Sequence, residues 1–158
     1  MKKVLLLMLS VAFFASCSPT QNAAKQSAKD FRGDWTLTSV TPREVGIQIT
    51  SLFNQAPQSC FVGSSWHLVA NNNSGNYIFN NVSCSSEPNK INWHMTNENG
   101  VNYFWFKRIA AGEKAKNVLT GYKLKVENIS DYQAHLSQEV PVGNQKTIID
   151  YYFTKTSK

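Results

Sequence analysis

Large apolar residues recur at every second position along most of the chain after residue 31, as in the run from Trp35 to Val40. This alternation places the large side chains on one face of an extended segment and therefore predicts β-strands. β-branched and aromatic residues, which favour strands, dominate the same segments. The predicted strands span 35–40, 66–70, 77–79, 91–95, 101–107, 118–127, 132–138 and 147–154. Helix signals are weak, since the best stretch, 43–54, also alternates.

The connections between these strands alternate between short and long. The short ones, at 71–75, 97–100 and 128–131, are rich in Asn, Asp and Gly, which suit tight turns. The long ones span 42–63, 82–88, 109–117 and 139–145. Every second connection of an antiparallel meander lies at the same end, so we expect one end closed by tight turns and a mouth ringed by loops. Because closure removes exposed sheet edges, we predict an all-β fold, an eight-stranded antiparallel up-and-down β-barrel.

The first residues predict an export signal. Lys2 and Lys3 precede an apolar run and the small residues before Cys17, a pattern typical of a signal peptide over 1–16. The end of this segment resembles the lipobox of bacterial lipoproteins, which implies that Cys17 becomes the first mature residue and carries a lipid anchor. An ordinary secretory cleavage near Cys17 is the alternative.

Residues 17–30 are polar and small and show no apolar period, so we predict a lipidated flexible tether. The folded domain is predicted to cover 31–158. Cys60 and Cys84 remain as a pair, and in an oxidising compartment a disulfide between them is expected. Two buried free thiols are the alternative. Both cysteines fall in odd-numbered connections, so both are predicted to lie at the mouth.

The first long connection has an apolar face of its own. We predict that it folds over the mouth as a lid; a ninth strand or a short helix packed outside the barrel is the alternative. Its apolar residues are Val45, Ile47, Ile49, Leu52 and Phe53.

The apolar phase of each strand points large, mostly aromatic side chains into the barrel. An eight-stranded barrel is either filled by side chains or holds one small ligand. Buried Tyr hydroxyls and Trp ring nitrogens need partners, so this lining suits an apolar ligand with a polar group. Rings that meet in the middle and leave no cavity are the alternative. The candidate ligand-binding residues are Trp66, Leu68, Tyr77, Phe79, Trp93, Tyr103, Trp105, Tyr122, Leu124, Leu136 and Tyr151, with Ile149 and Phe153 also predicted inward.

In the segment 103–106 both faces are apolar. We predict that Phe104 and Phe106 point outward, against the lid, a partner or lipid. Elsewhere alternation places His67, His94 and His135 outside the barrel, on strands that are not all adjacent, and so disfavours a metal site.

Composition argues against catalysis and nucleic-acid binding. The chain has no nucleophile elbow, phosphate-binding loop or zinc-binding helix motif, and the mid-strand Asp150 is expected to be exposed. The net charge is +6, falling to +4 without Lys2 and Lys3, and the basic residues are scattered. We expect no enzymatic activity, no cofactor, no metal and no nucleic-acid partner.

Short motifs carry a resemblance to a known family. Gly33-Asp34-Trp35 matches a Gly-x-Trp motif at the first strand, and Ser130-Asp131-Tyr132 is similar to a Thr-Asp-Tyr motif before the seventh. With the segments 60–66 and 72–77, the chain resembles the lipocalin superfamily over about 31–155, in particular the short lipocalin-like lipoproteins of bacteria.

The resemblance implies a cation stacked on the first-strand Trp. The family has an Arg after the last strand, and Lys155 occupies the comparable place. Lysine lacks the planar guanidinium, but cation–π attraction to Trp35 persists in part.

Together these features predict a membrane-anchored protein that binds or carries a small, largely hydrophobic ligand in its barrel. The alternative is a protein-binding module, an inhibitor or envelope-complex subunit, that acts through its mouth loops with a filled barrel. Ser18 follows Cys17 and no acidic run comes after it, so the resemblance suggests the periplasmic face of the outer membrane.

Overall fold

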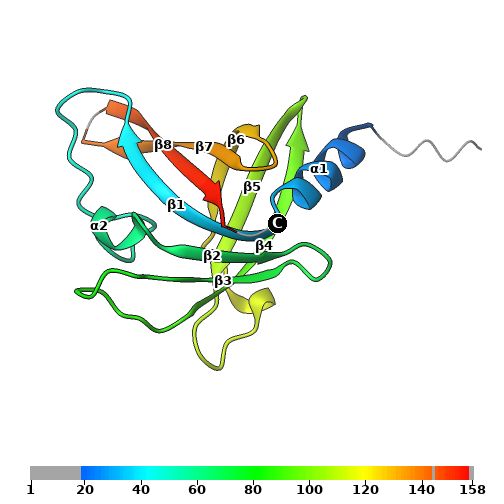
Figure 1. Ribbon diagram of the computed structural model, residues 1–158. Coiled ribbons are helices and arrows are strands. Elements are labelled where there is room, and N and C mark those ends of the chain that lie inside the picture. Colours follow the sequence, from blue (N-terminus) through cyan, green and yellow to red (C-terminus); the bar gives the residue numbers. More distant parts are fainter. Residues whose placement is uncertain (1–18, 144, 157–158) are drawn as a thin grey trace, which may run out of the picture.

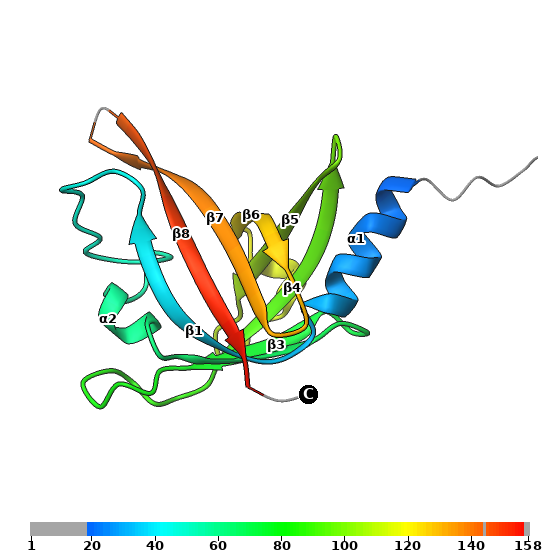
Figure 2. The same ribbon diagram turned by 45° about the horizontal axis from the view of Figure 1, so that its top comes forward.

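The described chain forms a closed barrel of strands β1 to β8 (Figures 1 and 2). The computed structural model describes residues 19–143 and 145–156. Each strand pairs antiparallel with its sequence neighbours, and β8 returns to pair with β1, which confirms the predicted eight-stranded up-and-down barrel. The strands are β1 (Gly33–Pro42), β2 (Ser65–Val69), β3 (Ser74–Ile78), β4 (Asn89–Glu98), β5 (Val101–Arg108), β6 (Tyr122–Ile129), β7 (Gln133–Val142) and β8 (Gln145–Lys155). The helices are α1 (Pro19–Asp30), α2 (Gln58–Phe61) and the 3-10 helix η1 (Ala115–Asn117).

Tight turns close one end of the barrel, as predicted. In the β2–β3 and β4–β5 turns, Asn73 and Asn99 have φ values of 57° and 52°, a left-handed backbone that Asn tolerates better than most residues. The connections β1–β2, β3–β4 and β5–β6 are longer and lie at the mouth. The β7–β8 connection is shorter than the predicted 139–145, because the two strands stay paired out to Val142 and Gln145.

β5 presents the opposite face to the interior from the one predicted. Phe104 and Phe106 are 1% and 2% exposed inside the barrel. Tyr103 and Trp105 lie on the outer face and are half-buried. All four residues are aromatic, so alternation in the sequence does not distinguish the two faces. The strand register does, since Phe104 lies opposite the buried Met95 of β4.

Residues 19–30 form a helix rather than the flexible tether that we predicted. α1 packs along β4 and β5 beside the barrel (Figure 1). Ala24 and Ala28 pack against the core, and Asn102 donates a hydrogen bond from Nδ2 to Ser27 Oγ at 2.6 Å. The helix is polar on average and packs against the core through alanines, so it lacks the stripe of large apolar residues by which an amphipathic helix is found in a sequence.

The predicted signal peptide 1–16 and the predicted lipidation site Cys17 lie outside the described residues. The domain boundaries at 17 and 31 stay predictions. Within the described part of the chain, no helix combines the length and the apolar character needed to cross a membrane.

Phe31, between α1 and β1, plugs the closed end. Its fully buried ring lies 5.2 Å from the Trp35 ring, 5.1 Å from Phe104 and 5.6 Å from Phe153, measured between centroids. Trp35 donates a hydrogen bond from Nε1 to the Phe31 carbonyl at 3.0 Å. The junction between α1 and β1 is therefore part of the barrel core.

The residues of the two short motifs, together with Lys155, lie at the closed end. Lys155 Nζ lies 5.0 Å from the centroid of the Trp35 ring. Gly33 has a φ of 106°, and a Cβ there would lie 3.4 Å from Lys155 Cε, so glycine permits both the turn and the passage of the lysine. Asp131 and Tyr132 are exposed in the β6–β7 turn, where the Tyr132 carbonyl accepts a hydrogen bond from Lys155 N at 2.8 Å.

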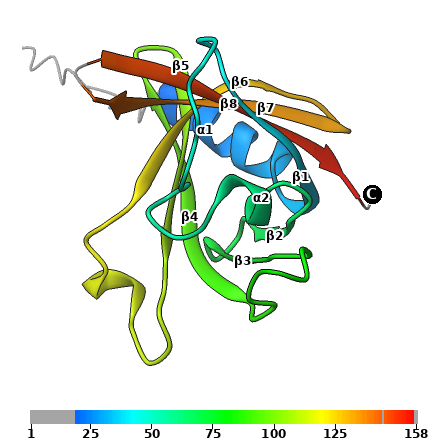
Figure 3. The same cartoon turned by 90° about the vertical axis from the view of Figure 1, so that its left-hand side faces the viewer.

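The predicted disulfide joins two connections at the mouth. Cys60 and Cys84 are bonded, with their Cα atoms 5.8 Å apart. The bond ties α2, in the β1–β2 connection, to the β3–β4 connection. Figure 3 views this side of the molecule and shows α2 among the surrounding strands.

Candidate functional site

Aromatic rings fill the barrel from its closed end up to the lid. Trp66 stacks on Tyr77 with ring centroids 4.5 Å apart and meets Phe106 and Phe153 edge-on at 5.5 and 5.7 Å. Its Nε1 donates a hydrogen bond to Ser64 Oγ at 2.9 Å. Side chains fill this part of the interior, as in the filled-barrel alternative. The candidate ligand-binding residues within it are Trp66, Tyr77, Phe79, Trp93, Leu124 and Leu136.

The lid enters the mouth. Leu52 and Phe53 are 2% and 8% exposed. The Phe53 ring stacks on Tyr151 at 5.4 Å and meets Phe106 and Tyr122 edge-on at 5.0 Å each. The predicted lid is therefore present, with Phe53 as its plug.

The prediction that Val45 belongs to the apolar face of the lid is wrong. Val45 is fully exposed, because it stands near the start of the connection, before the chain turns into the mouth. Ile47 and Ile49, further along, are half-buried.

A pocket of about 460 Å³ remains between the lid and strands β6 to β8. This volume lies within the range of small-molecule sites. Among the candidate ligand-binding residues, Tyr122 and Tyr151 line this pocket. The lid contributes residues 47–54, and the strands contribute Tyr122, Gln138, Val140, Pro141, Val142, Thr147, Ile149 and Tyr151.

Two tyrosine hydroxyls give the pocket fixed polar groups. Tyr151 donates a hydrogen bond to Gln138 Oε1 at 3.0 Å, and Tyr122 donates one to the Phe53 carbonyl. Burial raises the pKa of Tyr151 and that of Tyr122 above the ordinary tyrosine value. Both hydroxyls are therefore neutral donors near neutral pH.

Thr147 is a polar residue of the pocket wall whose hydroxyl is left unpaired by the described chain. It is 2% exposed, and its Oγ1 has no hydrogen-bond partner among the described residues. Leaving a buried hydroxyl unpaired costs about 1–3 kcal/mol. Sequence reasoning missed Thr147 and Gln138, because a single polar residue in a strand gives no pattern; the pairing of Thr147 with Val140 across β7 and β8 is what places it in the pocket.

A charged cluster holds the root of the lid on the outside of the barrel. Arg43 contacts both carboxylate oxygens of Asp150 at 2.8 Å, and His135 Nε2 lies 2.7 Å from Asp150 Oδ1. Asp150 is only 6% exposed, so the expectation that it is exposed is wrong: its side chain lies outside the barrel but under Arg43 and His135. Hydrogen bonds from Arg43, joined by that from His135, lower the pKa of Asp150 although burial raises it.

The three histidines lie on the outer face of the barrel. His67 Nδ1 lies 2.6 Å from Asp34 Oδ1, His94 stacks on Trp105, and His135 belongs to the Asp150 cluster. Burial and the nearby Lys107 lower the pKa of His94. Within residues 19–143 and 145–156, no group of three metal-ligating side chains comes together.

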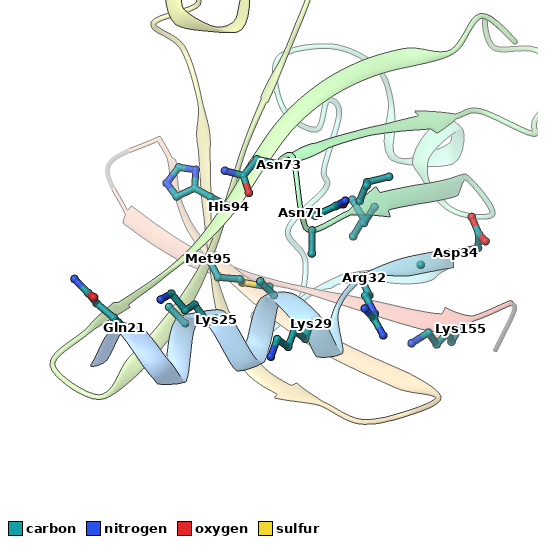
Figure 4. A pocket seen from close by; sticks show the side chains of 16 residues that line it. Gln21, Lys25, Lys29, Arg32, Asp34, Asn71, Asn73, His94, Met95 and Lys155 are labelled. Atoms are coloured by element: carbon teal, nitrogen blue, oxygen red, sulfur yellow. The ribbon is translucent and has the colours of Figure 1, made fainter. Parts of the chain in front are cut away.

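A larger hollow, about 1080 Å³, lies at the closed end of the barrel between α1 and strands β1, β2 and β4 (Figure 4). We call it the helix groove. Among the candidate ligand-binding residues, Leu68 lines it. The groove is bounded by the β2–β3 turn and the start of β1, so it belongs to the closed end, away from the mouth pocket.

Comparison with known proteins finds no matching family model, no matching curated protein and no matching solved structure. The closed eight-stranded antiparallel barrel is therefore established from the chain's own structure.

Proposed function

We propose that the protein binds a small, largely apolar ligand with one polar group in the mouth pocket beneath the lid. The observation that carries this proposal is the unpaired hydroxyl of Thr147 in the wall of a pocket of about 460 Å³. A pocket that pairs a mostly apolar wall with a few fixed polar groups is the usual form of a small-molecule site. The filled lower barrel limits the ligand to the mouth.

The chemistry of the wall defines the ligand class. Ile47, Ile49 and Ile149 provide apolar surface, which favours a hydrocarbon body. Thr147 offers a donor and an acceptor, and Gln138 retains amide donors beside the Tyr151 hydroxyl. A neutral hydroxyl, carbonyl or amine group on the ligand fits these partners better than a full charge, because no charged side chain lines the pocket among the described residues.

The cellular setting in this proposal follows from the sequence. The lipobox-like end of the first segment supports a lipid anchor on Cys17, and the Cys60–Cys84 disulfide suits an oxidising compartment. The motifs at Trp35 and Tyr132, together with the eight-stranded barrel, support a lipocalin-like lipoprotein at the periplasmic face of the outer membrane. Its role is that of a binding protein without catalysis.

Titration with 1-aminoanthracene, a neutral apolar fluorophore with one amine, tests the proposal. We expect its emission to rise on binding, with one site per chain. Val140→Phe, which fills the pocket, should lower the affinity for the probe about tenfold. Ile148→Phe is the matched control, because Ile148 neighbours Thr147 on β8 but points to the outer face. Equal binding by both variants, or no response across a panel of neutral apolar probes, would refute a ligand site in the mouth.

A protein-binding role remains the second candidate, and the filled barrel interior favours it. The outward apolar patch expected at Phe104 and Phe106 does not exist, since both are buried. The outer face of β5 instead carries Tyr103 and Trp105, with Lys123 Nζ 4.0 Å from the Tyr103 ring centroid. If this role is correct, replacing Trp105 with Ala should abolish co-purification with an envelope protein while 1-aminoanthracene fails to bind.

A further inference from the structure

The helix groove has an apolar floor. Ala24 and Ala28 come from α1, and the buried Leu68 and Met95 come from β2 and β4. Ala24 and Ala28 are four residues apart and so share one face of the helix. Because alanine carries only a methyl group, α1 rests close to the barrel at these two positions and leaves the space of about 1080 Å³ beside them.

One rim of the groove is positively charged. Lys25, Lys29 and Arg32 stand at helical spacing and lie on the α1 side in Figure 4. All three are exposed, and none forms an ion pair with a carboxylate that the structure describes. Lys155 adds a fourth cation from the end of β8.

The rest of the rim carries one carboxylate and is otherwise neutral. Asn71 and Asn73, from the β2–β3 turn, lie across the groove from the helix (Figure 4). Asp34 is the acidic side chain in the lining, and its Oδ1 lies 2.6 Å from His67 Nδ1. The four cations therefore outnumber the one carboxylate in the described lining, and this net positive charge beside apolar surface is complementary to a molecule with an anionic head and a hydrocarbon body.

The geometry favours a single small amphiphile over a macromolecule. A flat lipid surface would not reach Leu68 and Met95 at the floor. An extended peptide usually gains affinity by pairing with a free strand edge, and α1 already packs against β4, whose pairing with β3 ends at Asn92. The planar guanidinium of Arg32 suits carboxylate and phosphate oxygens alike.

We propose that the helix groove binds an anionic amphiphile with one alkyl chain, whose head contacts Lys29, Arg32 and Lys155 and whose chain lies on the floor formed by Ala24, Ala28 and Met95. This site is separate from the mouth pocket. It requires no opening of the lid.

Binding of dodecyl phosphate to the full-length protein, below the concentration at which micelles form, tests this site. Calorimetry measures the affinity, and the Met95 methyl signal in an NMR spectrum reports the location. We expect one site, about tenfold weaker binding for Lys29→Gln with Arg32→Gln, and unchanged binding for Lys114→Gln with Lys116→Gln. The control pair removes the same charge from exposed residues around η1.

Four further comparisons separate the contribution of the head from that of the chain. Dodecanoate should bind as dodecyl phosphate does, whereas dodecylphosphocholine, whose head has no net charge, should bind about tenfold more weakly. Inorganic phosphate alone should not bind measurably. Ala24→Leu, which extends a side chain into the groove while keeping every cation, should weaken the binding of dodecyl phosphate.

Four results would overturn the proposal. They are equal binding of inorganic and dodecyl phosphate, equal binding by the two Lys and Arg variant pairs, a response at Thr147 in the mouth without one at Met95, and no binding of either anionic probe. Binding of a hexaglutamate peptide as tight as that of dodecyl phosphate would identify the groove as a site for acidic peptides instead. Failure of 1-aminoanthracene at the mouth leaves this test unaffected, since the two sites share no lining residue.

Discussion

The closed end of the barrel and its mouth use the same aromatic residues in different ways. At the closed end the rings of Phe31, Trp35 and Phe104 meet directly, and the Trp35 nitrogen has its hydrogen bond. At the mouth, Phe53 has to enter from a connection, and Thr147 stays unpaired beside it. The comparison separates a part of the molecule that provides stability from a part that retains space for another molecule.

The largest expected effect comes from the closed end. Phe104→Ala should lower the free energy of unfolding by about 3–5 kcal/mol, because it leaves a cavity among packed rings. Trp105→Ala, its neighbour on the outer face, should cost about 1 kcal/mol. Urea denaturation of both variants measures the difference. A larger loss for Trp105→Ala would contradict the strand phase described for β5.

The disulfide tests whether the mouth is an independent unit. Replacing Cys60 and Cys84 with Ser should lower the free energy of unfolding by about 3 kcal/mol, because the bond closes a loop of moderate length. We also expect faster hydrogen exchange at the Leu52 amide, which bonds to the Ala56 carbonyl at 2.9 Å. Protection at the closed end, around Trp35, should persist when exchange is measured by NMR. Equal loosening of both ends would show that they form one cooperative unit.

The Asp150 cluster gives the mouth a dependence on pH. The pKa of Asp150 is lowered in the folded state from its ordinary 3.8, first by hydrogen bonds from Arg43. Its contribution to stability is therefore fully present above about pH 4 and is lost as the pH falls through the lowered pKa. Asp150→Asn should cost about 2 kcal/mol at pH 7 and should flatten the loss of stability in acid.

Thermal unfolding between pH 2 and pH 7 measures this effect. Asp131→Asn is the control, because Asp131 is exposed in the β6–β7 turn. If both variants keep the acid transition of the parent protein, another carboxylate is responsible.

The smallest expected effect comes from Thr147. Thr147→Val removes a hydroxyl that has no partner in the described chain, so it should leave the free energy of unfolding unchanged or raise it by about 1 kcal/mol. The same change should weaken the binding of 1-aminoanthracene. Thr154→Val, on the exposed face of β8, should alter neither quantity. A loss of stability above about 1 kcal/mol for Thr147→Val would mean that the hydroxyl is already satisfied.

A structural feature of this protein could be predicted only where it leaves a regular pattern in the sequence. The barrel could be predicted, because turn residues such as Asn73 mark the short connections that alternate with long ones. The disulfide could be predicted, because Cys60 and Cys84 both fall in long connections at the same end. The face of β5 could not, since its residues are large and aromatic on both sides, and only the pairing of Phe104 with Met95 decides between them.

The missed parts of the candidate sites have a different physical cause. α1 is polar and rests on the barrel through Ala24 and Ala28, so its docking depends on small residues that have no distinctive pattern. Arg43 and Asp150 are far apart in the sequence. Thr147 is placed in the pocket wall only by its pairing with Val140 on the neighbouring strand. Each depends on strand register or on contacts distant in sequence, which one chain's pattern does not reveal.

The chain enters and leaves the barrel at its closed end. Phe31 enters the barrel beside the Trp35 ring, and Lys155 ends β8 over that ring. A fusion partner or affinity tag placed directly after Lys155 would consequently stand next to the helix groove and leave the mouth accessible. Reporter fusions intended to study the groove are better inserted in the exposed β5–β6 connection around Lys114, which lies at the mouth end of the barrel.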